Sequence, residues 1–153
     1  MGKRVLILFC GICGIICRFE SLYGQTYNMA SGTITTCSGT FYDNGGSVGS
    51  YTSNCNITET FTSSAGNCLI FTFTSFNTQT GNDILTIYDG PSTASPVIGN
   101  YSGGISPGTI NSSTSSLTFK FVSNASGNKI GWSAVISCGS CGTSYFLNNN
   151  STI

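Results

Sequence analysis

Charged side chains are scarce in this chain of 153 residues, and histidine is absent. Only 7% of the residues are charged, with five Lys or Arg against five Asp or Glu. Without histidine, Ser-His-Asp triads and metal sites built on imidazole are excluded. The four carboxylates of the body of the chain are scattered, which does not favour a paired general acid and base. We therefore expect a protein that is not an enzyme.

The chain also lacks a basic patch. Residues 25–153 contain two lysines and four carboxylates, which gives a net charge of −2. Nucleic-acid binding leaves a basic footprint on a protein, so nucleic acid is not an expected partner. Gly, Ser, Thr and Asn dominate the polar residues, and Phe and Tyr are plentiful. This composition is typical of an extracellular all-β module with many turns, and the length suits one domain.

Residues 1–24 have the layout of a signal peptide. Two basic residues precede an apolar run over 5–17, which is too short to span a bilayer. Cleavage after Gly24 is predicted, which leaves a secreted or surface-displayed chain with no membrane span. An uncleaved anchor is the alternative, and Arg18 and Glu20, which follow the run at once, count against it.

Five cysteines remain after the leader: Cys37, Cys55, Cys68, Cys138 and Cys141. Exported proteins sit where disulfides persist, and five thiols allow two bridges with one cysteine left over. We expect a Cys37–Cys55 bridge, which would close a Gly-rich loop and contribute about 3 kcal/mol in the chain-entropy model. Cys68 is expected to pair with Cys138 or Cys141. The Cys138-Gly-Ser-Cys141 spacing also occurs in thiol oxidoreductases, but no βαβ pattern surrounds it here.

The body of the chain alternates apolar and polar residues with a period of two, the pattern of half-buried strands. Turn residues separate these segments, and no stretch shows helical periodicity. The pattern predicts an all-β fold, an antiparallel β-sandwich. Its expected core consists of the apolar positions of the strands: Leu69, Phe71, Phe73, Leu85, Ile87, Leu117, Phe119, Phe121, Trp132, Ala134 and Ile136.

Two aspartates bracket one predicted strand in the segment GNDILTIYDG, residues 81–90. Asp83 stands at its entrance and Asp89 at its exit. A carboxylate at a strand end, beside a Gly-rich loop, either caps the turn or ligates a hard cation such as Ca²⁺. From these residues alone both interpretations remain open.

Six segments of the chain stand out together: CSGTFYDNGG (37–46), Tyr51 before Cys55, LIFTFTSF (69–76), DILTIYDG (83–90), LTFKFVS (117–123) and GWSA (131–134). Together they resemble a CUB domain, most closely the CUB domains of secreted bacterial proteins. The resemblance covers residues 37–138, about two thirds of the chain, in family order. It implies a jelly-roll sandwich with a binding role and no catalysis. We therefore divide the chain into a signal peptide (1–24), a lead-in (25–36), a CUB-like domain (37–138) and a tail or linker (139–153).

The resemblance also implies a Ca²⁺ site, because many members hold Ca²⁺ at one end of the sandwich with a Glu and two Asp. The first Asp falls on Asp83, the Glu falls near Gln79, and the second Asp falls on Asn124. Two of the three carboxylates are thus amides in this chain. Amide oxygens can ligate Ca²⁺, but the lower charge weakens the site. The alternative is that Asp83 caps the turn at 80–83.

The expected function is that of a secreted, non-catalytic binding or adhesion module for an extracellular protein or a glycan, with Ca²⁺ as the candidate cofactor. Loops on a rigid scaffold usually carry recognition, which points to the loops 77–82, 90–96 and 124–129. A structural spacer in a larger exported surface protein is the alternative. The sequence does not set the oligomeric state. The candidate contact residues are Thr78, Asn82, Asp89 and Asn128.

Overall fold

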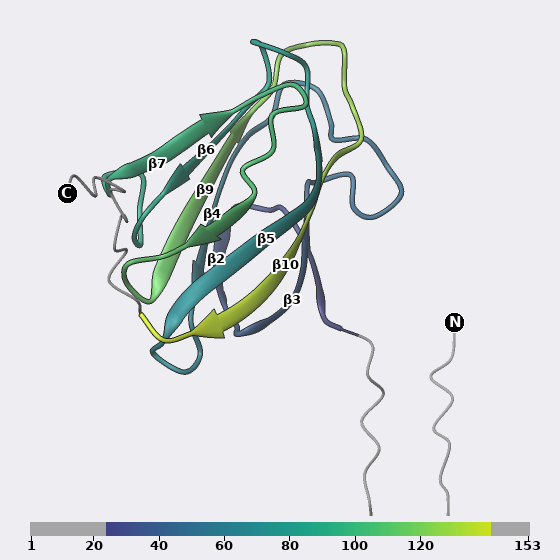
Figure 1. Cartoon of the computed structure of the whole chain (residues 1–153). Coiled ribbons are helices and arrows are strands. Elements are labelled where there is room, and N and C mark those ends of the chain that lie inside the picture. The colour runs from purple at the N-terminus through teal and green to yellow at the C-terminus, as the bar shows by residue number, and fades with distance from the viewer. Residues whose placement is uncertain (1–23, 142–153) are drawn as a thin grey trace, which may run out of the picture.

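The fold is a sandwich of two five-stranded β-sheets (Figure 1). The computed structural model describes residues 24–141. The predicted signal peptide, apart from Gly24, and the tail beyond Cys141 lie outside the described residues. The all-β sandwich predicted from the sequence is confirmed. Among residues 24–141, the structure contains no helix that is long and apolar enough to cross a membrane.

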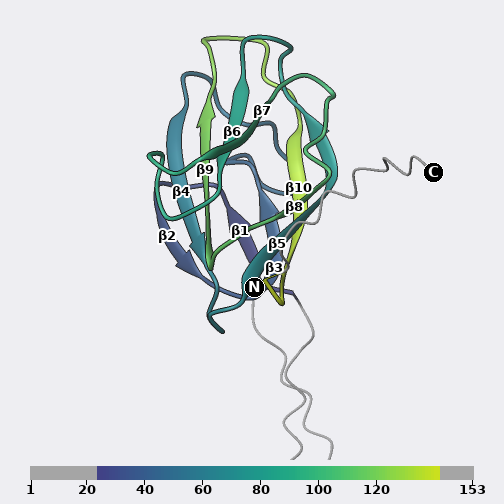
Figure 2. The same ribbon diagram turned by 60° about the vertical axis from the view of Figure 1, so that its left-hand side comes forward.

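Each sheet draws its strands from distant parts of the chain. In the first sheet the order is β1 (Thr26–Asn28), β3 (Ser38–Tyr42), β10 (Gly131–Gly139), β5 (Cys68–Asn77) and β8 (Thr109–Asn111). In the second sheet it is β2 (Gly32–Thr35), β4 (Asn56–Thr62), β9 (Ser116–Val122), β6 (Ile84–Tyr88) and β7 (Val97–Tyr101). Figure 2 shows the two sheets turned by 60° relative to Figure 1.

The predicted lead-in takes part in both sheets. Strand β1 pairs with β3, and β2 pairs with β4, and both pairs are parallel. All other strand pairs are antiparallel, as expected from the sequence. The side chains of Tyr27 and Ile34 pack against the core, which explains why these short segments dock on the sandwich. The sheets are therefore mixed, with the parallel strands at one edge of each.

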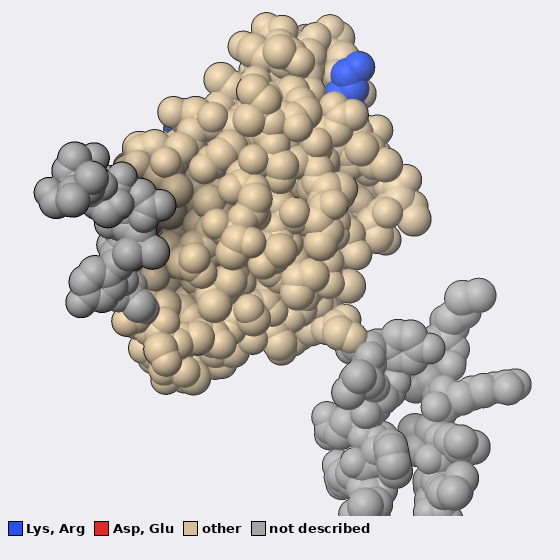
Figure 3. Space-filling view, viewed as in Figure 1, with Lys and Arg blue, Asp and Glu red and all other residues tan. Residues whose placement is uncertain are grey.

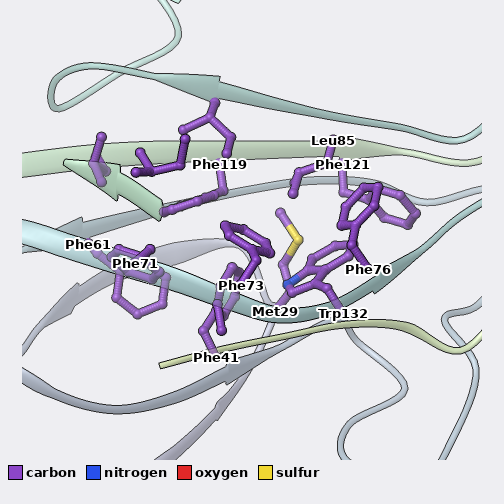
Figure 4. Packing of buried hydrophobic residues seen from close by; sticks show 14 of the residues in the cluster. Met29, Phe41, Phe61, Phe71, Phe73, Phe76, Leu85, Phe119, Phe121 and Trp132 are labelled. Carbon is purple, nitrogen blue, oxygen red and sulfur yellow. The ribbon is translucent and has the colours of Figure 1, made fainter. Parts of the chain in front are cut away.

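The core lies between the sheets and contains the predicted residues together with others, such as Phe41, Phe61 and Phe76, that the alternation did not single out. All eleven predicted core residues are buried. Four phenylalanines at its centre, Phe41, Phe61, Phe71 and Phe119, contact one another in tilted or edge-to-face pairs (Figure 4). Their ring centroids are 4.8–5.9 Å apart. Such pairs contribute roughly 0.5–1.5 kcal/mol each beyond the burial of their area.

Two disulfides, Cys37–Cys138 and Cys68–Cys141, fasten one end of the sandwich, which we call the disulfide end. The expected Cys37–Cys55 bridge is wrong. Cys37 lies beside Ser63, just after the last residue of β4, with 3.2 Å between Sγ and Oγ. Cys55 precedes the first residue of β4, and a strand of seven residues spans about 23 Å. Cys55 is instead the free, buried cysteine of the described chain.

Both ends of the described chain leave the sandwich near the disulfide end (Figures 1 and 2). Gln25 accepts a hydrogen bond from the backbone of Thr40 in β3, and Cys141 is bonded to Cys68 at the start of β5. Preceding or following residues are thus attached at the disulfide end. The opposite end, which we call the loop end, carries no chain terminus of the described part.

Candidate functional site at the loop end

Three loops carry the candidate site at the loop end: 43–55, 78–83 and 123–130. A fourth segment, 102–108, which follows β7, joins them there through the backbone bond from Thr78 N to Gly103 O at 2.9 Å. Strand pairing brings them together. Asn77 at the end of β5 is the partner of Gly131 at the start of β10. Likewise, Ile84 at the start of β6 is the partner of Val122 at the end of β9. The residues expected for a Ca²⁺ site, Gln79, Asp83 and Asn124, therefore lie at the same end of the molecule.

Asp83 is fully buried, and both of its carboxylate oxygens already accept hydrogen bonds. Oδ2 accepts from the hydroxyl of Tyr51 at 2.6 Å, and Oδ1 accepts from the backbone N–H of Asn124 at 2.8 Å. The carboxylate of Asp83 therefore connects two other loops. The alternative interpretation of the sequence, in which Asp83 caps the turn at 80–83, is wrong.

Gln79 closes this arrangement into a ring. Its backbone N–H donates to the Tyr51 hydroxyl at 3.0 Å, and its side-chain Oε1 accepts from Asn124 Nδ2 at 2.7 Å. Tyr51, Asp83, Asn124 and Gln79 thus form a closed circuit, which we call the hydrogen-bonded ring. The ring joins all three loops, so that none of them can shift alone without breaking one of its bonds.

Tyr51 is the member of the ring whose role the sequence did not reveal. Its side chain is fully buried and packs edge-to-face on Phe121, with 5.0 Å between the ring centroids. Burial, together with the hydrogen bond to Asp83, raises the pKa of Tyr51 to about 12. The phenol therefore keeps its proton and stays a donor to Asp83 throughout the neutral range.

The ring residues do not offer a Ca²⁺ ion a set of free oxygen ligands. Asn124 Oδ1 accepts from the backbone N–H of Ser126 at 2.9 Å, and this bond turns the Asn124 amide N–H group toward Gln79. Asn124 thus presents to Gln79 an N–H group, which cannot ligate a cation. Nor does any group of three or more His, Cys, Asp or Glu suited to a metal ion occur in residues 24–141.

A second buried carboxylate, Asp43, holds the loop 43–55 against the start of β10. Oδ1 accepts from Gly45 N at 2.7 Å, and Oδ2 accepts from Trp132 N at 3.1 Å. Burial raises the pKa of Asp43 above its ordinary value. Gly131 has a φ of 72°, and a Cβ atom there would collide with the Asp43 carboxylate. Only glycine satisfies both conditions at this position.

The predicted contact residues are not all accessible, nor all at this end. Thr78 is only 1% exposed, so it cannot contact a partner. Its hydroxyl donates to Asp83 O and accepts from Gly103 N, and it therefore supports the loop from within. Asn82 is exposed at the loop end, and Asn128 is partly buried and accepts from Ser53. Asp89 follows β6, whereas Asp83 precedes it, so Asp89 and the loop 90–96 lie at the opposite end.

The loop end exposes several aliphatic side chains among neutral polar residues, and it carries little charge. Val48 is 94% exposed, Ile105 74% and Ile130 61%, and Ile84 and Val122 are exposed to a smaller extent. These are five of the eight exposed large hydrophobic residues of the described chain. Most carboxylates of that part are buried, which leaves Lys129 as an exposed charge at this end. Figure 3 shows how little charge one whole face of the molecule carries.

Comparison with known proteins agrees with this architecture. A family model described as CUB domain matches residues 30–135, so the match includes β2 from the predicted lead-in. The crystal structure of the MASP-1 CUB2 domain bound to Ca²⁺ is similar, with a TM-score of 0.61 and 22% identity. That match covers 71% of this chain and 99% of the other.

Two further structures match at similar levels. The CUB1-EGF-CUB2 domain of human MASP-1/3 has a TM-score of 0.60 and 19% identity, covering 76% of this chain and 44% of that one. The full extracellular region of zebrafish Gpr126/Adgrg6 has a TM-score of 0.59 and 20% identity, covering 71% of this chain and 14% of that one. At such identities the matches show the fold alone.

Proposed function

Because this chain belongs to the CUB domain family, whose members are generally non-catalytic extracellular modules, we propose that it binds an extracellular protein through the loop end. The observation that carries the proposal is the group of exposed aliphatic side chains at this end, Val48, Ile105 and Ile130 above all. Exposed apolar side chains that gather in one region of a surface mark an interaction site.

The chemistry of these side chains favours a protein over a glycan. All exposed large hydrophobic residues among residues 24–141 are Val or Ile, and none is aromatic. Full burial of one such side chain contributes roughly 1.5–3 kcal/mol, and association costs roughly 4–15 kcal/mol of lost freedom. One or two of these side chains are therefore not enough. A stable complex needs a complementary apolar surface that covers several of them together.

Electrostatics adds one requirement for the partner. Lys129 is the charged residue exposed at the loop end, whereas Asp43 and Asp83 are buried and hydrogen-bonded. A partner with a carboxylate at the rim of its apolar surface would therefore associate faster than one without it. Both ends of the described residues 24–141 lie near the disulfide end, which supports the proposal further, because neither of these two ends covers the loop end. The narrower part of the sequence resemblance, to the CUB domains of secreted bacterial proteins in particular, stays a prediction.

The test uses the mature chain, residues 25–153, on an array of extracellular proteins and glycans. The loop-end variant carries Val48→Ser, Ile105→Ser and Ile130→Ser. The matched control carries Val97→Ser, Ile98→Ser and Val135→Ser, which removes three exposed aliphatic side chains elsewhere. We expect a protein ligand whose affinity falls at least about tenfold in the loop-end variant, which corresponds to about 1.4 kcal/mol, and is retained in the control.

Other outcomes of the same array contradict the proposal. Silence across all proteins and glycans would favour a structural spacer. Specific capture of a glycan would replace the protein partner with a carbohydrate. An equal loss of affinity in the loop-end variant and in the control variant would mean that the recognition surface is not the loop end.

A further inference from the structure

We infer that the loop end of this chain is locked without a metal ion, by an amide pair, Gln79 and Asn124, that stands where metal-binding members of the family use Ca²⁺. This inference goes beyond partner binding, because it concerns how the binding end is held in shape. It also reverses the expectation of a Ca²⁺-assisted site that came with the family resemblance.

The first argument is the continuity of the hydrogen-bonded ring. Its four bonds are 2.6–3.0 Å long and join residues that lie 28 to 45 positions apart in the sequence. A bound cation typically holds loops together by ligating several of them at once. Here the same three loops are already joined by protein donors and acceptors alone, and no buried side-chain oxygen or nitrogen of the ring lacks a hydrogen bond.

The second argument is the polarity of the two amides. Ca²⁺ takes six to eight oxygen ligands, and carboxylates supply most of the charge that it requires. The ring has one carboxylate, and a side-chain N–H group of Asn124 points at Gln79 Oε1. To present an oxygen instead, Asn124 would have to turn its amide and give up the bond that Oδ1 accepts from Ser126 N.

The third argument is the tight surroundings of Gln79. A Cβ atom at Gly127 would lie 2.5 Å from Gln79 Nε2, which shows that the chain of the loop 123–130 runs directly against this amide. Gly127 has a φ of 80°, a conformation that suits glycine, and its missing Cβ lets the backbone pass close to the Gln79 side chain. The backbone of the loop 123–130 therefore packs directly against the Gln79 amide, in addition to the hydrogen bond that Asn124 donates to it.

This arrangement predicts which substitutions create a dependence on Ca²⁺. In Gln79→Glu, the new carboxylate can still accept from Asn124 Nδ2. In Asn124→Asp, Gln79 can rotate and donate Nε2 to the new carboxylate. Each single variant thus keeps one N–H group between the two side chains. Only the double variant places three carboxylates together with no side-chain N–H between them, and a bound cation then relieves their mutual repulsion.

The experiment compares thermal melts of the mature wild type, both single variants and the double variant, in EDTA, in Ca²⁺ and in Mg²⁺. For the wild type, and likewise for each single variant, the melting midpoint is expected to be the same in all three buffers. The double variant is expected to melt lower in EDTA. At a tenfold excess of Ca²⁺ over its dissociation constant its midpoint should rise by roughly 5 °C, with little effect of Mg²⁺.

Two results would overturn the inference. One is a Ca²⁺-dependent rise in the melting midpoint of the wild type that is lost in Asp83→Asn. The other is a double variant that melts at the same temperature, or fails to fold, with and without Ca²⁺. Because no partner takes part in these melts, they decide the inference independently of whether the loop end binds a protein.

Discussion

Glu59 is a carboxylate inside the sandwich, and its burial makes stability depend on pH. It lies on β4 between Ile57 and Phe61, with Phe119 of β9 as its partner across the sheet. The residue is 3% exposed, and its one hydrogen bond comes from Ala30 N to Oε2 at 3.2 Å. Burial is the main cause that raises the pKa of Glu59 from 4.5 to about 7.

The sign of the effect follows from proton counts. Between pH 4.5 and about 7 the folded protein holds a proton on Glu59 that the unfolded chain has released. Folding stability contributed by this group is therefore full below pH 4.5 and is lost as the pH rises through about 7. A difference of about 2.5 pKa units corresponds to at most about 3 kcal/mol.

The substitution Glu59→Gln isolates this contribution. Its amide oxygen can still accept from Ala30 N, and it carries no charge at any pH. We expect the variant to exceed the wild type in unfolding free energy by about 1–3 kcal/mol at pH 8, because the new N–H group requires an acceptor and offsets part of the gain. Near pH 4.5 the two proteins should differ little. Urea unfolding from pH 4.5 to 8.5 measures both.

The comparison with the variant also cancels what other titrating groups contribute to the pH dependence of stability. The pKa of Asp43 is raised as well, which adds to the pH dependence of both proteins equally and cancels in the difference. If the difference in unfolding free energy between wild type and Glu59→Gln is constant across this pH range, the carboxylate of Glu59 is solvated and the reasoning is refuted.

Three further predictions concern the loop end and the cysteines. Tyr51→Phe removes the hydroxyl that links Gln79 N and Asp83, and should cost about 1–3 kcal/mol in urea unfolding; an unchanged midpoint would mean that the ring contributes nothing to stability. Gly131→Ala forces a Cβ atom against Asp43 at a φ of 72° and should lower the melting midpoint, whereas Gly104→Ala, where a Cβ would meet no neighbour, serves as the control. The non-reduced mature chain should expose one reactive thiol only in denaturant, and Cys55→Ala should abolish it; a thiol that reacts in the folded protein would contradict the burial of Cys55.

The alternation of apolar residues was sufficient to predict the sandwich and eleven of its core residues, whereas Phe41 and Phe61 at the centre of the core were missed. Leu117, Phe119 and Phe121 show why, since these three apolar residues recur at every second position of β9 and all three are fully buried. The period of two is a local property of a strand, and it can be seen in a single sequence. The short N-terminal strands were harder to recognise, because β1 has three residues and β2 has four, and both become strands only by docking on longer neighbours.

The candidate site was predicted only in part, because its bonds join distant loops. Gln79, Asp83 and Asn124 were found through the family resemblance, and they do lie together. Tyr51 and Asp43 were missed as hydrogen-bonding partners, because Tyr51 bonds a residue 32 positions away and Asp43 one 89 positions away. The Cys37–Cys55 pairing failed for the same reason. Closeness in sequence suggested it, but β4 separates the two residues in space.

The measurement that tests the central claim most directly is backbone hydrogen exchange of the mature wild type in EDTA. The N–H groups of Gln79 and Asn124 are the two backbone donors of the hydrogen-bonded ring. If this ring holds the loop end, both amides exchange as slowly as those of the core strands, and adding Ca²⁺ leaves their rates unchanged. Fast exchange of these amides in EDTA, with protection only when Ca²⁺ is added, would contradict a loop end that is locked by hydrogen bonds alone.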